Sequence, residues 1–408
     1  MALTTEEPAR FVLDPATLDV HGDNERLRAA GALVPVEIEG VRAWAAARYS
    51  ALEAVLAHPD LSRDVRHWSA EGRRSLCPAG TLAQVVLART MLNAEGDDHR
   101  RLRGPLSPLF SARRIAALRP RVEAVTADFV DRLAELPPGP ADLRREFAYP
   151  LPCDVISDIM GIPRDRRPVL HEHGHVLATT RGGADELTGA RTARDAVIRE
   201  VVDERRRNPA GDLISELVAL EGRELTAGEV FDTVQEVFVA GHATTVNLIT
   251  NAVRLLLSRP DQLALVRSGA RPWSAAVEEA LRLEPPLRHF PMRYATRDVE
   301  IGGVTVRRGE AVLACFAAAG RDPDRYGERA ARFDLAPDAP PHLSFGHGPH
   351  FCLGAPLGRL VGEVALAALF EAFPGIALAA AEDELRPVPS VLAVSTTSLP
   401  VLLGGRAR

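Results

Sequence analysis

The sequence contains no lysine, so all 49 basic side chains among its 408 residues are arginines. We attribute this absence, together with the abundance of Ala, Leu and Gly, to the codon bias of a GC-rich genome. The 55 acidic residues outnumber the arginines and leave a net charge of −6. Because nucleic-acid-binding domains carry a basic patch or stripe, this balance argues against a nucleic-acid partner.

Cysteine is scarce too, and its four occurrences are scattered at Cys77, Cys153, Cys315 and Cys352. The sequence has no Cys-x-x-Cys pair, which excludes the usual zinc and dithiol motifs. Isolated thiols fit a reducing cytosol. The sequence also lacks a run of about 18 apolar residues, and residues 1–8 lack the pattern of a signal peptide. We therefore expect a soluble, cytoplasmic protein without a membrane partner.

Helical periodicity is the dominant pattern that the sequence does contain. The clearest strands are a hairpin around Gly302-Gly303 and the segment 399–403. No repeat, long linker or low-complexity tract divides the chain. The pattern predicts one mainly α-helical domain with small β-sheets over residues 1–408, with its core at about 30–403. The helices are expected at 113–136, 146–160, 190–207, 227–257, 274–283 and 356–373.

One cysteine has an unusual setting. Cys352 lies in the loop Ser344-Phe345-Gly346-His347-Gly348-Pro349-His350-Phe351-Cys352-Leu353-Gly354-Ala355, directly before an apolar helix. We expect Gly346, Gly348 and Gly354 to adopt positive φ and to let the backbone approach a flat ligand. The N-terminal N–H groups of the following helix favour a thiolate over a thiol. A buried structural cysteine beside a helix cap is the alternative.

The spacing Phe-x-x-Gly-x-His-x-Cys-x-Gly, from Phe345 to Gly354, resembles the haem-binding signature of the cytochrome P450 superfamily. The resemblance covers the whole predicted core and implies a single-domain fold, a triangular helical prism around a buried haem b. It makes Cys352 the iron ligand and places Phe345, Gly346, His350 and Gly354 around the haem. A cysteine thiolate pushes electron density onto haem iron and favours cleavage of the O–O bond. Because the sequence has no apolar run that could anchor it in a membrane, it resembles the soluble bacterial members of the family. We expect a monomer.

The longest predicted helix begins with a capping box, Thr226-Ala227-Gly228-Glu229, and runs without proline to Ser258. Its roughly 32 residues span about 48 Å, so it has to cross the molecule. Its middle contains Ala240-Gly241-His242-Ala243-Thr244-Thr245, where a glycine and polar residues interrupt the apolar pattern, as is expected at a functional site. A plain helix kink is the alternative.

This middle segment resembles the oxygen-binding helix of the family. The resemblance implies that Ala240 and Gly241 leave room for O2 above the iron and that Thr244 relays protons. The family usually has Glu or Asp before that threonine, whereas this chain has Ala243. Because a carboxylate there would draw protons in from solvent, its absence leaves the route of the protons open.

Glu279 and Arg282 lie three residues apart on one face of the helix expected at 274–283, where they can form an ion pair. Taken alone, they would be a solvated surface pair that contributes less than about 1 kcal/mol. Their position before the cysteine loop resembles the Glu-x-x-Arg element of the family. That resemblance implies a structural role behind the haem, in a network completed by Arg332.

A buried haem needs cationic or hydrogen-bonding partners for its two propionates. Four positions match the partners that the family uses, namely His99, Arg103, Arg293 and His350. His99 and Arg103 are four residues apart and therefore share a helix face. For each arginine, an ordinary surface charge is the alternative.

The resemblance also implies a mostly apolar substrate pocket, lined from the ranges 66–92, 165–185, 287–292 and 391–394. In the third range, Arg288 and His289 are polar among apolar neighbours. They can orient an acidic or hydroxylated substrate, or face solvent or a propionate. The residues assigned to the pocket are Val237, Leu287, Arg288, His289, Phe290, Leu392 and Ala393.

Electrons have to come from a separate donor, because nothing in the sequence resembles a flavin or iron–sulfur domain. The resemblance implies a ferredoxin with its ferredoxin reductase. In the family pattern, Arg100, Arg101 and Arg359 lie on the cysteine side, where they can dock an acidic ferredoxin by charge complementarity. Ordinary solvated arginines are the alternative.

These features predict a haem-thiolate monooxygenase that uses O2 to hydroxylate or otherwise oxidise a small or medium organic molecule in bacterial secondary metabolism. One alternative keeps the haem but couples or desaturates its substrate without inserting oxygen, which Ala243 favours. Another is a non-catalytic haem sensor or binding protein. A sensor would consume no oxygen when electrons are supplied, and the relay threonine argues against it.

Overall fold

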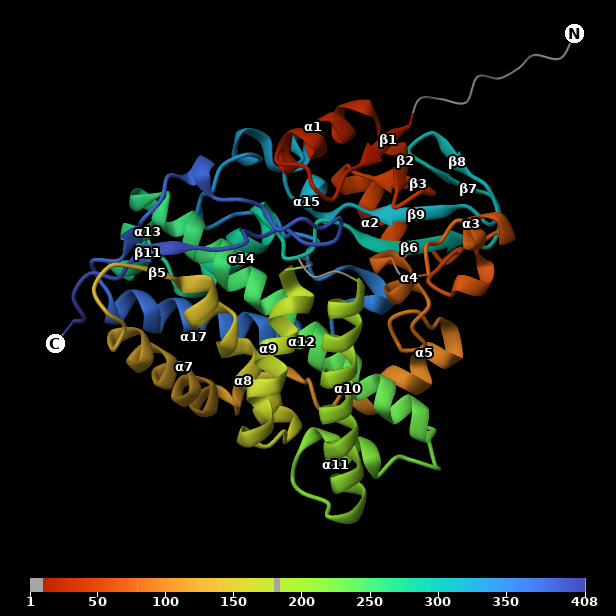
Figure 1. Cartoon of the computed structure of the whole chain (residues 1–408). Coiled ribbons are helices and arrows are strands. Elements are labelled where there is room, and N and C mark those ends of the chain that lie inside the picture. The colour runs from red at the N-terminus through yellow and green to blue at the C-terminus, as the bar shows by residue number, and fades with distance from the viewer. Residues whose placement is uncertain (1–9, 79, 180–183, 408) are drawn as a thin grey trace, which may run out of the picture.

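The computed structural model describes residues 10–78, 80–179 and 184–407. Helices form most of it, and the β-strands gather mainly at one side (Figure 1). The helices are α1 (Val20–Ala30), α2 (Tyr49–Ala57), α3 (Ala70–Arg74), α4 (Thr81–Val86), α5 (Gly96–Arg103), α6 (Ala112–Ala116), α7 (Arg119–Ala134), α8 (Pro150–Met160), α9 (Arg167–Thr179), α10 (Ala184–Arg207), α11 (Leu213–Val218), α12 (Ala227–Leu257), α13 (Pro260–Arg267), α14 (Trp273–Leu283), α15 (Phe316–Ala319), α16 (Pro323–Tyr326) and α17 (Ala355–Ala372).

The strands form three sheets. The strands are β1 (Phe11–Leu13), β2 (Leu33–Ile38), β3 (Val41–Ala46), β4 (Leu61–Ser62), β5 (Pro140–Asp142), β6 (Phe290–Ala295), β7 (Val299–Ile301), β8 (Val304–Val306), β9 (Ala311–Ala314), β10 (Ala377–Leu378) and β11 (Pro400–Leu402). The largest sheet has the order β1-β2-β3-β9-β6-β4. Its parallel β3–β9 pairing sets Trp44 opposite Val312, so the N-terminal strands lie beside strands from the second half of the chain (Figure 1).

Helix α12 runs through the helical part and packs against α8, α14 and α17. Its capping box forms as predicted: Glu229 N–H donates to Thr226 Oγ1 (3.2 Å), and Thr226 N–H donates to Glu229 Oε2 (2.8 Å). Every residue from 245 to 256 is buried, which places the second half of the helix in the core. In the middle, by contrast, Val239 and Ala240 are exposed. The predicted polar segment therefore lies where the helix leaves the packed core.

The structure confirms the predicted helix 227–257 and matches 274–283 and 356–373 within one residue. The predicted helix 113–136 is two helices, because Pro120 begins α7 after the short α6. The segment 146–160 starts with a wider π-type turn before Pro150 opens α8. The β7–β8 hairpin and β11 confirm the two predicted strand regions.

The sequence patterns missed the large sheet, whose short strands pair residues far apart in the chain. Within the described residues, no helix is both long and apolar enough to cross a membrane. Of the ranges assigned to the substrate pocket, residues 79 and 180–183 lie outside the described part of the chain.

Candidate functional site

The cysteine loop is held by its own backbone. The N–H of Cys352 donates to Phe345 O (2.7 Å), and the N–H of Gly346 donates to Leu343 O (2.7 Å). Gly346 and Gly348 have φ of +77° and +72°, which confirms the predicted left-handed conformations. For Gly354 that prediction is wrong: its φ is −82°, which any residue adopts, and it precedes the first turn of α17.

Two opposing influences act on the Cys352 thiol. The residue is exposed, but the many protein atoms around the sulfur raise the pKa of the thiol. The N–H groups of Gly354 and Ala355 and the charges of Arg103 and Arg359 lower it. Burial is the larger influence in the protein alone, while the N–H groups at the start of α17 act in the predicted direction and favour the thiolate. A coordinated metal cation deprotonates a thiol outright, so the loop is suited to a metal-bound thiolate.

Cys153 and Cys315 are buried residues, and no backbone N–H of the described chain lowers the pKa of either thiol. Burial raises the pKa of Cys315 to about 12 and that of Cys153 further still. These thiols stay protonated and behave as apolar core residues.

The middle of α12 carries the residues assigned to oxygen. Thr244 Oγ1 donates to Ala240 O (2.7 Å), and Thr245 Oγ1 donates to Gly241 O (2.9 Å). The helix nevertheless continues without a break. A Cβ on Gly241 would lie 2.9 Å from Ile156 Cδ1 on α8. The missing side chain of Gly241 therefore allows α8 and α12 to pack closely, a role that the sequence did not predict.

His242 lies next to the exposed segment, but its side chain contacts Tyr149, the residue before α8. Its Nε2 is 3.3 Å from Tyr149 O, and its ring meets the Tyr149 ring edge-on with centroids 4.7 Å apart. Burial lowers the pKa of His242 to about 4. A neutral, buried imidazole of this kind is a packing residue and not a proton donor for Thr244.

Basic side chains gather around Glu95, the residue before α5. Its Oε1 lies 3.2 Å from His350 Nε2 and 3.8 Å from Arg293 Nη1. The rings of His99 and His350 have centroids 4.2 Å apart. The structure thus brings His99, Arg293 and His350 together, as the propionate assignment requires. Arg103 lies against the cysteine loop instead and donates from Nη2 to Phe351 O (2.6 Å).

Arg63 belongs to the same cluster, and the sequence analysis missed it. Its side chain is buried, its guanidinium lies 4.8 Å above the Phe290 ring, and its backbone N–H donates to Glu95 Oε1 (2.8 Å). Burial and the neighbouring Arg293 lower the pKa of Arg63 to about 9. The signal that would have found it is the pairing of β4 with β6, which sets Ser62 opposite Tyr294. Sequence patterns alone do not give that register.

This cluster has more buried donors than acceptors. Within the described chain, Arg63 Nε and Nη2, Arg293 Nη2 and His99 Nε2 have no hydrogen-bond partner. A buried polar group without a partner costs about 1–3 kcal/mol, so such donors point to acceptors that the protein itself does not supply. The two carboxylates of a haem meet this demand for both charge and hydrogen bonds. The residues present therefore fit a haem, with Cys352 for the iron and this cluster for the propionates.

The Glu279–Arg282 pair is buried, so the surface alternative is wrong. Arg282 Nε and Nη2 donate to the two Glu279 oxygens at 2.8 and 2.7 Å. Arg282 also donates to the backbone carbonyls of Gly320 and Arg332, both at 2.7 Å. The prediction for Arg332 needs a correction: its carbonyl completes the network, while its side chain is exposed.

The residues assigned to the substrate pocket divide into two groups. Leu287, Phe290, Leu392 and Ala393 are partly exposed, and Val237 is buried. The predicted alternatives for Arg288 are wrong, because it is 1% exposed and its Nη2 bonds to Asp23 Oδ2 on α1 at 3.1 Å. His289 is fully buried as well, and burial lowers its pKa well below the usual range. Neither side chain faces solvent or an open cavity.

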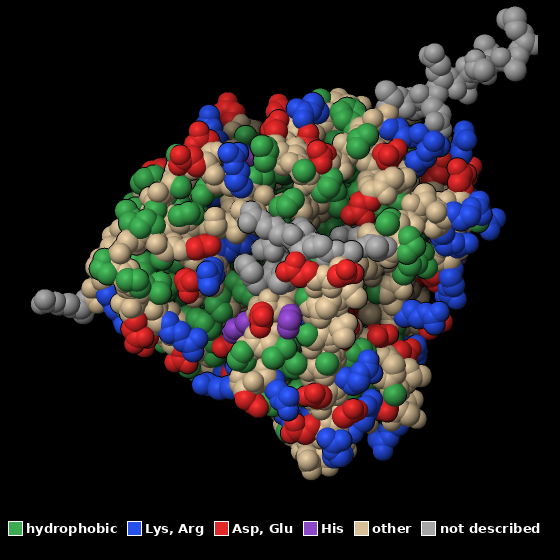
Figure 2. Space-filling view, in the orientation of Figure 1, with side chains coloured by type: hydrophobic (Ala, Val, Ile, Leu, Met, Phe, Trp, Pro, Cys, Tyr) green, Lys and Arg blue, Asp and Glu red, His purple; other side chains and the backbone are tan. Residues whose placement is uncertain are grey.

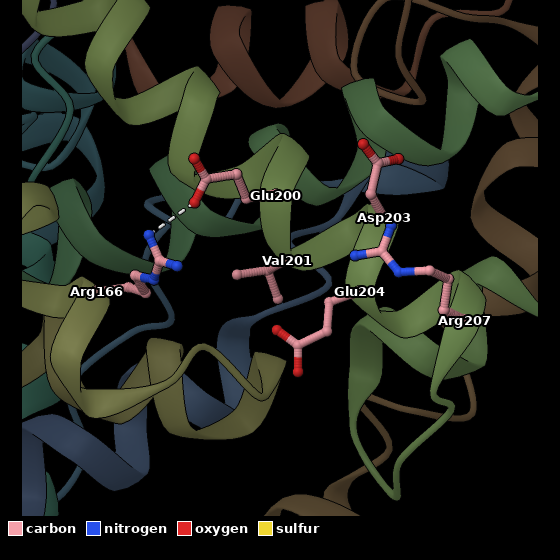
Figure 3. A pocket seen from close by; sticks show the side chains of 6 residues that line it. All are labelled: Arg166, Glu200, Val201, Asp203, Glu204 and Arg207. Atoms are coloured by element: carbon pink, nitrogen blue, oxygen red, sulfur yellow. Dashed lines mark hydrogen bonds and ion pairs between the residues drawn. The ribbon is translucent and has the colours of Figure 1, made fainter.

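A separate surface pocket of about 290 Å³ lies against α10. Figure 3 shows Glu200 and Arg166 facing each other at this pocket, and their ion pair has a length of 2.7 Å. Three acidic residues and two arginines dominate its lining. Because pockets for organic substrates are mostly apolar, we assign it no ligand.

The arginines assigned to electron-donor docking all have acidic partners. Arg100 is paired with Asp97, Arg101 Nη2 lies 2.6 Å from Glu229 Oε1, and Arg359 Nε lies 2.7 Å from Glu278 Oε1. Figure 2 shows the same mixing of acidic and basic side chains across the face that it presents. These residues therefore form local ion pairs, and not a patch of one sign.

Comparison with known proteins leads to the same family as the cysteine motif. A family model, Cytochrome P450, matches residues 273–397. The chain is 36% identical to 2-hydroxy-5-methyl-1-naphthoate 7-hydroxylase of Streptomyces carzinostaticus, over 97% of this chain and 98% of that protein. The chain belongs to the cytochrome P450 family. This P450 is therefore an oxidoreductase of the monooxygenase type, and the family implies a haem-iron cofactor.

Solved structures of P450s agree with the whole fold. CYP154C4 from Streptomyces sp. W2061 has a TM-score of 0.93 and 38% sequence identity, over 99% of this chain and all of that chain. CxnD, described as a P450 enzyme for C–S bond formation in chuangxinmycin biosynthesis, has a TM-score of 0.87 and 31% identity, over 98% and 99% of the two chains. The predicted fold class, mainly α with small sheets, is confirmed.

Proposed function

We propose that this P450 binds haem b and uses O2 and electrons from a ferredoxin and its reductase to hydroxylate a small or medium organic molecule of bacterial secondary metabolism. The observation that carries the proposal is the pairing of a cysteine loop at the start of α17 with a buried basic cluster whose donors lack acceptors among the described residues. The haem, when bound, supplies the oxygen activation. A hydroxylase of an aromatic acid among the similar proteins supports the reaction class.

The protein contributes the sulfur ligand, the charges for the propionates and a shaped apolar surface. Val239 and Ala240 are exposed on α12, and Leu287 and Phe290 are partly exposed, so these side chains are available to form that surface. Apolar contacts of this kind bind and orient an organic molecule while keeping water away from it. The Thr244 hydroxyl donates to Ala240 O, which leaves the lone pairs of its oxygen free to accept a hydrogen bond from water.

Oxidative coupling or desaturation is the second candidate function. Ala243 removes the carboxylic acid that would draw protons in from solvent, and the similar protein CxnD is described as forming a C–S bond. Coupling and desaturation need the same two protons for each O2 as hydroxylation does, so the relative that forms a C–S bond is the observation that favours this candidate.

The test begins with the reduced protein and carbon monoxide, which report a thiolate-bound haem by a long-wavelength Soret band. A small-molecule library is then screened for the Soret shift that accompanies loss of water from the iron. Each hit is incubated with ferredoxin, its reductase, NADPH and labelled oxygen. Label in the product supports hydroxylation, whereas a product without label supports coupling or desaturation. A protein that binds haem but consumes no oxygen would be a sensor, contrary to both.

A further inference from the structure

The missing acid at position 243 raises the question of which group supplies protons on the oxygen side. Upstream of Thr244, α12 carries three acidic residues, Glu229, Asp232 and Glu236. Their spacings of three and four residues put them on one face of the helix. Continuing this stripe by four residues at a time from Glu236 leads to Ala240 and then to Thr244.

Glu236 is the inner member of this stripe and has an incomplete set of partners. The Thr90 hydroxyl and the Leu92 N–H, in the segment that follows α4, lie close enough to its carboxyl group to lower the pKa, and this N–H also donates to Thr90 Oγ1 (3.3 Å). Its Oε2 is buried and has no hydrogen-bond partner within the described chain. A proton on that oxygen is therefore not committed to another protein group there.

Burial also changes the protonation of Glu236. It raises the pKa of the carboxyl group to about 7, while the charge of Arg63 and the nearby Thr90 hydroxyl and Leu92 N–H oppose the shift and the charge of Asp232 adds to it. Near neutral pH this group exists in both forms, the condition under which a carboxyl group transfers protons most effectively.

Asp232 is the acidic residue of the stripe that lies between Glu236 and Glu229. It lies one turn closer to the start of α12 and is partly exposed. Burial and the charge of Glu229 raise its pKa, and Arg89 opposes them. Glu229 itself is bonded to Arg101 and Thr226, which lowers its pKa to about 2, so it stays ionised. Protons therefore enter the stripe at Asp232, with Glu229 as a fixed negative charge.

We propose that Asp232 and Glu236 form a carboxyl relay that carries protons from solvent along α12 to Thr244 Oγ1. The relay rests on the proposed monooxygenase function and replaces the acid missing at Ala243. Each proton that leaves Glu236 is replaced from Asp232, which takes one from solvent, so both groups end the cycle unchanged. At 1.5 Å per residue, the Cα atoms of Glu236 and Thr244 are about 12 Å apart. Ordered water completes the last step between the two side chains.

The central variant is Glu236→Gln, which keeps the shape and the contacts to Thr90 and Leu92 but cannot donate an acidic proton. With NADPH and the donor proteins, we expect the product formed per electron pair to fall several-fold and hydrogen peroxide to rise. The solvent isotope effect on product formation should increase, and the pH dependence centred near 7 should disappear. Asp232→Asn should give the same changes to a smaller extent. Without the Asp232 carboxyl group, water can still deliver protons to Glu236, but more slowly.

Two rescue experiments separate a relay from simple damage to the fold. Hydrogen peroxide brings its own protons, so it should restore product in Glu236→Gln when it replaces NADPH and O2. Adding Ala243→Glu to Glu236→Gln should restore coupling with NADPH. Failure of both rescues would assign Glu236 to structure and overturn the relay.

A measurement that needs no turnover completes the test. Infrared difference spectra of the protein between pH 5 and pH 9 should contain the C=O band of a buried carboxylic acid that disappears in Glu236→Gln. Absence of this change, or unaltered coupling in Glu236→Gln, would overturn the relay. Loss of the thiolate Soret band in the native protein would instead overturn the monooxygenase function, so the two failures are distinguishable.

Discussion

The two sides of the haem site are built in different ways. On the cysteine side, the loop from His342 to Gly354 is closed by hydrogen bonds between residues close in sequence, and two glycines supply the required backbone conformation. On the α12 side, the acid stripe depends on Thr90 and Leu92, more than a hundred residues away. The comparison teaches that local sequence specifies the ligand side, whereas the proton supply depends on tertiary contacts.

The strongest way to break the cysteine side is Cys352→Ser. We expect complete loss of the long-wavelength Soret band of the reduced carbon monoxide complex, because a serine hydroxyl does not supply a thiolate ligand. Cys153→Ala and Cys315→Ala are the matched controls, since both thiols are buried and stay protonated. Persistence of the band in Cys352→Ser would move the ligand elsewhere.

The same contrast explains what sequence reasoning achieved. The motif at Cys352, the capping box at Thr226 and the helix 227–257 were predictable because each depends on residues close together in the chain. Arg63 was missed, and Arg288 was misplaced, because the pairing of β4 with β6 and the packing of α1 decide their surroundings. Tertiary contacts of this kind leave no periodic signal in the sequence.

Two adjacent glutamates on α14 sharpen the comparison between buried and exposed pairs. Glu279 is 4% exposed and bonded to Arg282. The Glu278 side chain is 42% exposed and is paired with Arg359 and, at 3.2 Å, with His342. Breaking a buried pair leaves an uncompensated charge, so Glu279→Gln should lower the free energy of unfolding by about 3–5 kcal/mol. Glu278→Gln should lower it by less, because its partner Arg359 is partly exposed and glutamine can still form a hydrogen bond with His342. Equal losses in urea unfolding would contradict the buried network.

Arg63 tests the tertiary part of the haem site. Arg63→Gln removes a buried cation whose Nε and Nη2 have no hydrogen-bond partner in the described chain. We therefore expect the protein to lose haem about tenfold faster, as is typical when a residue that supports a bound metal group is replaced. Transfer of the haem to an excess of apomyoglobin measures this rate. Arg66→Gln is the control, because Arg66 is paired with Asp64 and its side chain is 79% exposed. A haem loss rate that is the same in both variants would remove Arg63 from the propionate cluster.

Thr244 and Thr245 allow a matched test on the α12 side, because both hydroxyls bond back to α12 carbonyls. Thr245 is buried, whereas Thr244 is partly exposed at the open middle of the helix. Thr244→Ala should lower the product per electron pair several-fold and release peroxide, since the last proton-carrying hydroxyl is gone. Thr245→Ala should retain most of the coupling. Full coupling in Thr244→Ala would refute its relay role.

The smallest effect is expected at the arginines assigned to docking. Because Arg100, Arg101 and Arg359 are paired with acidic residues, their attraction for an acidic ferredoxin is partly cancelled. Replacing all three by Gln should slow reduction about two- to threefold at low salt and hardly at all at high salt, since rim charges act on the encounter rate. Stopped-flow reduction by a ferredoxin measures this, with Arg406→Gln, which breaks the Asp131 pair, as control. A tenfold lower rate of reduction at low salt would show that the arginines leave their acidic partners when the ferredoxin docks. An unchanged rate at low salt would show that the ferredoxin docks on another face of the protein.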